Sequence, residues 1–385
     1  MTGPLDGLLV ADFSRVLAGP YATMLLADLG ADVVKVEGPG GDETRSWTPP
    51  QREGISTYYL GINRGKRSVV LDLREADDVA AARELARRAD VLIQNLRPGG
   101  MAKFGLDFES VRRDNPGVVY ASISGFGSGA GAEMPGYDLL VQAMSGLMSL
   151  TGSPDGPGYR AGISVFDVMA GNHAVIGILG ALRHRDATGE GQHVEVNLMS
   201  SALTGLVNHS SAWAAGGVVP YRMGNAHPSV FPYEPFPTAD HDLIVIAAND
   251  RQFQRLCGAL GIPEVAEDER FLHNGDRTTN RDALRPLLEE QLARRTAQEW
   301  FDVLTAAGIP CGPINTIDGG FAAAERFGLE PIIEVGEGDR ALPTTRHPIR
   351  FSATPVDYTL PPPELDEHGA EVRAWLSTAP PEEDA

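Results

Sequence analysis

The sequence predicts an α/β fold in which helices cover both faces of a mostly parallel sheet. Over the first 200 residues, short β-branched runs alternate with segments of helical periodicity, which is the pattern of a doubly wound sheet. The alternation begins with a strand at 8–12, continues through Ala18-Gly19-Pro20 into a helix over 21–29, and reaches a second strand at 32–36. A length of 385 residues is enough for two to three domains.

The same alternation continues to about residue 200. Further strands are expected at 68–73, 91–94, 118–124 and 193–197, and further helices at 77–88, 137–150 and 167–184. The apolar run from 168 to 182 is only fifteen residues long and contains Asn172 and His173, so it is too short to span a bilayer. We expect it to be a buried helix of a soluble protein.

The composition of the sequence changes after about residue 217. Five prolines crowd the segment from 220 to 237, which indicates a linker or an extended loop. Beyond them we expect a compact second domain with a strand at 243–248 and helices at 250–260, 281–294 and 296–307. The acidic, proline-rich remainder carries a short strand at 349–352 and a last helix around 371–376.

The charge balance limits the possible partners. The chain has 32 Lys and Arg against 52 Asp and Glu, a formal net charge of −20, which argues against a general surface for nucleic acid or anionic membrane. A basic subset nevertheless lies in the first 103 residues: Arg15, Lys35, Arg45, Arg64, Lys66, Arg67, Arg97 and Lys103. These residues are either ordinary surface charge or a local site for a phosphate-bearing ligand, and composition does not decide between the two.

The cysteines and the N-terminus indicate the compartment. Cys257 and Cys311 provide no disulfide framework, and two thiols fit a reducing environment. No basic region followed by an apolar stretch begins the sequence, so we expect no signal peptide and a cytoplasmic location.

A glycine-rich segment at 125–130 has the G-x-G-x-x-G/A spacing of a dinucleotide-binding loop and follows a predicted strand. Such a loop needs a helix that opens at once on its glycines, whereas Gly131 and Met134-Pro135-Gly136 come first here. An NAD(P)-dependent oxidoreductase is therefore disfavoured. The sequence also lacks a P-loop, a nucleophile elbow and any histidine or cysteine spacing typical of a metal site, so no metal is expected.

Ten segments in unbroken order resemble the class III CoA-transferases, the CaiB/BaiF family that includes formyl-CoA transferase and α-methylacyl-CoA racemase. They begin with ADFSRVLAGP at 11–20 and include SVFDVMAG at 164–171. The others lie at 25–37, 41–47, 63–68, 95–99, 124–127, 189–192, 224–228 and 307–313. Each motif alone is weak, but ten in order cover the chain from about residue 5 to 355.

The resemblance implies an architecture. It implies a large Rossmann-like CoA-binding domain over 1–200, a linker at 201–224, a small α+β domain over 225–325, and a linker with a return to the large domain over 326–385. It also implies a homodimer of two interlocked chains.

Asp167 is the candidate nucleophile. From its position alone, Asp167 opens an apolar helix and could be no more than its N-cap. The resemblance places the family's nucleophilic aspartate here. Attack of this carboxylate on an acyl-CoA gives a mixed anhydride, which the released thiolate converts to an aspartyl-CoA thioester. Coenzyme A thioester is then a substrate, and no permanently bound cofactor is expected.

The resemblance also implies a set of CoA-binding residues. They are Val16, Ala18, Leu71, Asn95, Leu96, Arg97, Lys103 and Tyr137. Arg97 and Lys103 fit this role because they supply positive charge for a phosphate. Gly38 replaces an arginine that some relatives carry, so Arg45 is a candidate to rebuild that part of the site.

The acceptor side of the site is less determined. Gly224-Asn225-Ala226-His227-Pro228 stands where formyl-CoA transferases carry a glycine-rich run, and it resembles relatives that act on dicarboxylates such as succinate. Gly224, His227 and Arg45 are the candidates for the acceptor pocket or oxyanion contacts, and Arg160 and Arg222 remain alternatives for holding a second carboxylate.

An acyl-CoA racemase of the same fold is the main alternative. The family's racemases carry a histidine base where this sequence has Tyr137. A tyrosine, with an ordinary pKa near 10, is a poor base at neutral pH. A non-catalytic CoA-binding protein is a further alternative, which the retained Asp167 disfavours.

Overall fold

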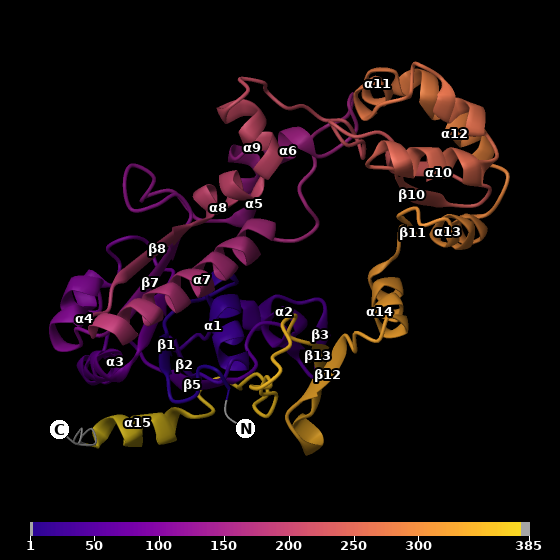
Figure 1. Ribbon diagram of the computed structural model, residues 1–385. Coiled ribbons are helices and arrows are strands. Elements are labelled where there is room, and N and C mark those ends of the chain that lie inside the picture. The colour runs from indigo at the N-terminus through magenta and orange to yellow at the C-terminus, as the bar shows by residue number, and fades with distance from the viewer. Residues whose placement is uncertain (1–2, 379–385) are drawn as a thin grey trace. The chain divides into compact units, whose positions relative to one another are not determined.

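The computed structural model describes residues 3–378, which form two compact units (Figure 1). Of the described residues, the first unit contains 3–147, 161–218 and 330–378, and the second contains 148–160 and 219–329. Residues 148–160 were expected in the large domain, but they group with the second unit.

The first unit is built on a six-stranded sheet in which every neighbouring pair is parallel. Its strands are β1 (Leu9–Asp12), β2 (Asp32–Glu37), β5 (Lys66–Val70), β6 (Val91–Gln94), β7 (Val119–Ser124) and β8 (His193–Asn197), in the order β5-β2-β1-β6-β7-β8. Numbered along the chain, this order is 3-2-1-4-5-6, so the winding reverses between β1 and β6. The predicted doubly wound fold is confirmed.

Helices cover both faces of this sheet. On one face α1 (Ala18–Asp28) and α7 (Val165–Thr188) bury Val10, Val33 and Ile93. On the other face α3 (Ala76–Arg88), α4 (Phe108–Asp114) and α15 (Gly369–Ser377) bury the alternate residues, among them Ala11, Val34 and Leu92. Successive strand residues thus serve opposite cores, as the period of a strand requires.

Helix α7 is longer than the sequence predicted. It runs for 24 residues, which by length and composition is enough to cross a membrane. The expectation that this segment is too short to span a bilayer is therefore wrong. Its side chains nevertheless contribute to the core: Ala170, Ala174 and Ile178 are fully buried against the sheet. The predicted packing role of this helix is therefore confirmed.

Several predicted boundaries are wrong. The expected helix at 137–150 is two pieces, α5 (Asp138–Met144) and α6 (Leu147–Leu150), separated at Gly146 with φ +95°. The expected linker at 201–224 contains α8 (Leu198–Gly205) and α9 (Val207–Ala214). The strand expected at 349–352 is irregular.

The first unit also contains short elements outside its main sheet. They are the 3-10 helices η1 (Glu43–Ser46), η2 (Ala102–Phe104) and η4 (Gly338–Arg340), the helix α2 (Thr57–Leu60), and the hairpins β3 (Gln51–Arg52) with β4 (Ile55–Ser56) and β12 (Ile332–Val335) with β13 (Leu342–Thr345). The C-terminal segment returns to the first unit, since Asp366 Oδ1 accepts a 2.7 Å hydrogen bond from the Val70 N–H beside α15.

The second unit is a small α+β body. Its antiparallel sheet has the order β11-β10-β9, formed by β9 (Tyr233–Pro237), β10 (Asp242–Ile246) and β11 (Cys311–Pro313). Its helices are α10 (Asp250–Leu260), η3 (Pro263–Glu267), α11 (Asn274–Thr279), α12 (Arg281–Leu292), α13 (Ala297–Ala306) and α14 (Ile317–Arg326). Phe236, Leu243 and Trp300 belong to a separate hydrophobic core.

Candidate active site

A cleft opens at the carboxyl edge of the parallel sheet, where the winding reverses. The chain segments that leave β1, β6 and β7 line it, together with Asp167 from α7. At the reversal itself, the side chain of Asn95 holds the backbone of Arg15: the Arg15 N–H donates to Oδ1 at 2.9 Å, and Nδ2 donates to the Arg15 carbonyl at 2.7 Å. Open α/β sheets bind ligands at this position.

Asp167 is the third residue of α7 rather than its N-cap. Ser164 occupies the N-cap position, without a capping hydrogen bond from its side chain. Instead Asp138 caps the helix, because its Oδ1 accepts the backbone N–H groups of Phe166 at 2.7 Å and of Asp167 at 3.2 Å. The interpretation of Asp167 as a mere cap is therefore wrong.

The carboxylate of Asp167 is available to a ligand in the cleft. Among residues 3–378, none donates a hydrogen bond to its side chain. Burial, and after it the nearby negative charge of Asp138, together raise the pKa of Asp167 from 3.8 to about 7. A half-buried, unpaired carboxylate of raised basicity is suited to act as a nucleophile or a base.

Two residues beside Asp167 were missed by the sequence analysis. Asp138 is buried and held by Gln142, whose Nε2 also donates to the Ile163 carbonyl at 3.1 Å. Burial and then the charge of Asp167 raise the pKa of Tyr58 to about 12, so its hydroxyl stays protonated near the nucleophile. Asp138 was notable only as a residue near the start of a predicted helix and beside Tyr137 in a family motif, and nothing in the sequence pointed to Tyr58.

Most of the expected CoA-binding residues lie together. Val16, Ala18, Asn95, Leu96, Arg97 and Tyr137 line the cleft that contains Asp167. Leu71 lies outside it, in a neighbouring hollow that Arg15 and Leu96 also line. Lys103 lines neither hollow, and its Nζ lies 4.6 Å above the ring of Phe104.

Arg15 joins Arg97 in the cleft. Between residues 3 and 378, no hydrogen bond or ion pair engages either guanidinium group, so both are available to an anionic ligand. Arg15 was part of the basic subset read from the sequence, but it was not singled out as a site residue.

Arg45 does not line this cleft. Its Nε and Nη2 bind the two oxygens of Glu37 at 2.9 and 2.7 Å, and Nη2 also lies 2.6 Å from the Tyr59 hydroxyl. Its guanidinium is therefore engaged in the polar interior, and the structure does not bring it together with Asp167.

Gly224 and His227 belong to the second unit, whereas Asp167 belongs to the first. The Gly224 N–H donates to the Gly152 carbonyl at 3.1 Å, and its φ of +65° suits glycine. The ring of His227 lies 5.0 Å from that of Tyr233, and its Nδ1 accepts the Ser229 N–H at 3.0 Å.

The glycine-rich segment after β7 does not open a helix, because α5 begins only at Asp138. Its glycines serve a close approach instead: a Cβ on Gly125 would lie 2.4 Å from the Cα of Gly136. The geometry agrees with the rejection of a dinucleotide-binding loop.

A doubly wound parallel sheet, with a cleft at the reversal of its winding and a basic carboxylate in that cleft, defines an α/β enzyme that acts on a bound anionic substrate. Comparison with known proteins identifies the family. Residues 5–369 match CoA-transferase family III.

The similarity extends over whole chains. The protein is 43% identical to the succinate–glutarate CoA-transferase of Agrobacterium fabrum, over 97% of this chain and 96% of that one. It is 40% identical to the acetyl-CoA:oxalate CoA-transferase of Acetobacter aceti, over 96% and 95% of the two chains. The crystal structure of a CAIB/BAIF family protein from Brucella suis has a TM-score of 0.87 at 42% identity and covers 98% of this chain and 100% of its own.

The chain belongs to CoA-transferase family III. It is an acyl-CoA:carboxylate CoA-transferase, as the order of its motifs implied.

Proposed function

We propose that this enzyme transfers CoA through Asp167, with a dicarboxylate as acceptor and succinyl-CoA as donor. The observation that carries the proposal is the carboxylate of Asp167, which faces the cleft with a raised pKa of about 7 and no internal partner among the described residues. The two relatives named above act on succinate, glutarate or oxalate, which are all dicarboxylates, and this supports the substrate class.

The transfer proceeds through covalent intermediates on Asp167. The Asp167 carboxylate attacks the thioester carbonyl, the C–S bond breaks, and CoA leaves as a thiolate from a mixed anhydride. The thiolate then attacks the acyl carbon of Asp167 and releases the donor acid, which leaves an aspartyl-CoA thioester. An acceptor carboxylate repeats both steps in reverse and departs as the new acyl-CoA, while Asp167 is regenerated.

The environment of Asp167 favours these steps. A carboxylate with a pKa of about 7 is more basic than an ordinary one, which favours its attack on the thioester carbonyl. A site withdrawn from water strengthens the hydrogen bonds that stabilise developing oxyanions. The hydroxyl of Tyr58 stays protonated, because burial and then the charge of Asp167 raise its pKa to about 12.

Coenzyme A is proposed to bind along the segments after β1 and β6. Val16, Ala18, Asn95 and Leu96 supply backbone and side-chain contacts, and Arg15 and Arg97 supply positive charge for its phosphates. Leu71 is assigned to the nucleoside end, in the neighbouring hollow. Gly224 and His227 remain candidates for the acceptor side.

The proposed assembly is an interlocked homodimer in the cytoplasm. Large apolar side chains are exposed on both units, including Ile176 and Trp213 on the first and Ile317 and Phe327 on the second. Apolar side chains that stay exposed on each unit are available for contacts with a second copy of the chain. Cys257 and Cys311 are free thiols, which suits a reducing compartment.

Intact-mass measurement tests the covalent step. The protein is mixed with succinyl-CoA, treated with hydroxylamine, and compared with Asp167→Ala. We expect a small mass gain from a hydroxamate in the parent enzyme and none in the variant. Equal labelling of both proteins would contradict the assignment, and acetyl-CoA in place of succinyl-CoA tests the donor.

A further inference from the structure

Val16, which forms part of the cleft wall, has a backbone conformation that is unfavourable for its side chain. Its φ is +68°, in the left-handed region that glycine adopts readily and a β-branched residue rarely does. Such a conformation persists only where the surrounding structure holds it. The contacts around Val16 must therefore stabilise this conformation.

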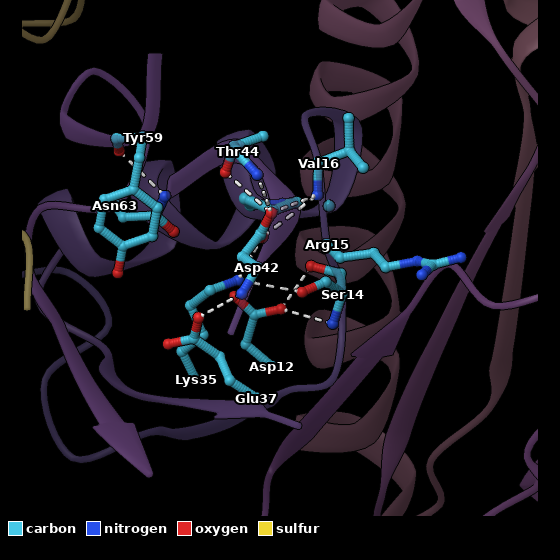
Figure 2. A network of polar contacts seen from close by, with 12 residues as sticks. Asp12, Ser14, Arg15, Val16, Lys35, Glu37, Asp42, Thr44, Tyr59 and Asn63 are labelled. Atoms are coloured by element: carbon cyan, nitrogen blue, oxygen red, sulfur yellow. Dashed lines mark hydrogen bonds and ion pairs between the residues drawn. The ribbon is translucent and has the colours of Figure 1, made fainter. Parts of the chain in front are cut away.

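The carboxylate of Asp42 holds the Val16 N–H, at 3.4 Å from Oδ1 and 3.2 Å from Oδ2 (Figure 2). Asp42 is itself buried, with 5% of its surface exposed. Its Oδ2 pairs with Lys35 Nζ at 3.0 Å, and its Oδ1 accepts from the N–H and hydroxyl of Thr44 at 3.0 and 2.8 Å. The carboxylate is thus fixed from three directions.

The two residues before Val16 are held in the same way. Lys35 Nζ donates to the Ser14 carbonyl at 3.1 Å, so one ion pair binds both Ser14 and Val16. Arg15 is held through its backbone by Asn95, and in Figure 2 its side chain points away from the buried network. Three consecutive residues of the loop are therefore fixed by side chains from other segments.

This network is buried and balanced in charge. It contains three carboxylates and three cations: Asp12, Glu37 and Asp42 with Lys35, Arg45 and Lys66. Removing one charge from such a set leaves another buried without its partner. The network also explains why Arg45 is engaged away from the cleft.

We propose that Asp42 is a positioning residue for CoA transfer: through the Val16 N–H, and with Lys35 holding it in place, it keeps residues 16–18 in the conformation that lines the cleft with Asp167. This inference rests on the proposed function of that cleft. Asp42 touches no reacting atom, and its effect passes through the backbone of Val16.

A double-mutant cycle tests the proposal. Asp42→Asn keeps the size of the side chain but removes the charge that pairs with Lys35, and we expect kcat/KM for succinyl-CoA to fall about thirtyfold. Val16→Gly removes the conformational strain, so in that background we expect the same Asp42 substitution to reduce kcat/KM by less than about threefold. An equal loss in both backgrounds, or no loss in either, would overturn the proposal.

A milder variant covers the case in which Asp42→Asn does not fold. Thr44→Val removes one donor to Asp42 but leaves the ion pair, and we expect a loss of about fivefold in kcat/KM that Val16→Gly again suppresses. The absence of this suppression would likewise count against the proposal.

Asp28→Asn is the matched control, because Asp28 forms a 2.6 Å buried ion pair with Arg64 in the same unit but outside the cleft. It should lower the unfolding temperature while kcat/KM stays within about twofold. A loss as large as that of Asp42→Asn would show that destabilisation alone explains the effect. Hydroxamate labelling separates the two claims: unlabelled parent enzyme contradicts the covalent mechanism, whereas labelled enzyme with no coupling contradicts only the role of Asp42.

Discussion

At the scale of single residues, Asp167 is set apart by what surrounds it. Its helix is capped by another carboxylate, Asp138, which accepts hydrogen bonds from the backbone N–H groups of Phe166 and Asp167. The same carboxylate places a negative charge near the nucleophile, and this adds to burial in raising the pKa of Asp167 to about 7. One residue thus orients the nucleophile and raises its basicity.

This raised pKa predicts a stability difference that depends on pH. Because the pKa of this carboxyl rises from 3.8 to about 7 on folding, the folded protein loses stability as the pH rises between these values. The loss remains above pH 7. Asp167→Asn should therefore be about 2 kcal/mol more stable than the parent at pH 8, with a smaller difference at pH 5. Denaturant unfolding at both pH values measures this. A variant less stable than the parent at pH 8 would contradict it.

Asp138→Asn should move the pH dependence of the reaction. Removing the neighbouring charge lowers the pKa of Asp167, so the acidic limb of kcat/KM should shift to lower pH by about half a unit to one unit. The asparagine oxygen still accepts the N–H groups of α7, which preserves the helix cap. Initial rates from pH 5 to 9 test this, and an unmoved limb would show that the charge of Asp138 does not reach Asp167.

At the scale of elements, the sequence predicted most strands and helices, because alternating apolar runs and helix-start residues are local signals. Boundaries set by tertiary packing were not predicted. Helix α7 extends beyond its apolar stretch. Helices α8 and α9 lie ahead of the proline-rich segment, where a linker was expected. The pairing of Arg45 with Glu37 depends on packing that no local pattern records.

The segment after β7 gives a prediction at this scale. Because a Cβ on Gly125 would lie 2.4 Å from the Gly136 Cα, Gly125→Ala must push two backbone segments apart beside the cleft. We expect a loss of about 2 kcal/mol in stability and at least tenfold in kcat/KM. Gly129→Ala is the control, since nothing lies within 4 Å of a Cβ there. Similar effects of the two substitutions would contradict this explanation.

At the scale of the whole molecule, a strongly acidic chain presents a local basic site for an anionic substrate. Although the net charge is −20, Arg15 and Arg97 lie at the reversal of the sheet with no side-chain partner within residues 3–378. The order of strands there brings together segments 80 residues apart in the sequence. The ten ordered motifs predicted the family and the reaction, which the comparisons confirm. The strand order itself could not be derived from composition or periodicity.

The proposed dimer is tested by sedimentation. The chain has a mass of 41.1 kDa, and we expect a species of twice that mass that persists on dilution to nanomolar concentration, because interlocked chains separate only by unfolding. A monomer of unchanged activity would contradict the proposed assembly.

The central claim is that Asp167, and no neighbouring carboxylate, carries CoA during transfer. The most direct measurement is peptide mapping by mass spectrometry after the enzyme is quenched in acid during turnover with succinyl-CoA. We expect the mass of CoA as a thioester on the peptide that contains Asp167, at the side chain of that residue. An adduct on Asp138 instead, or CoA transfer without any adduct, would contradict the role of Asp167.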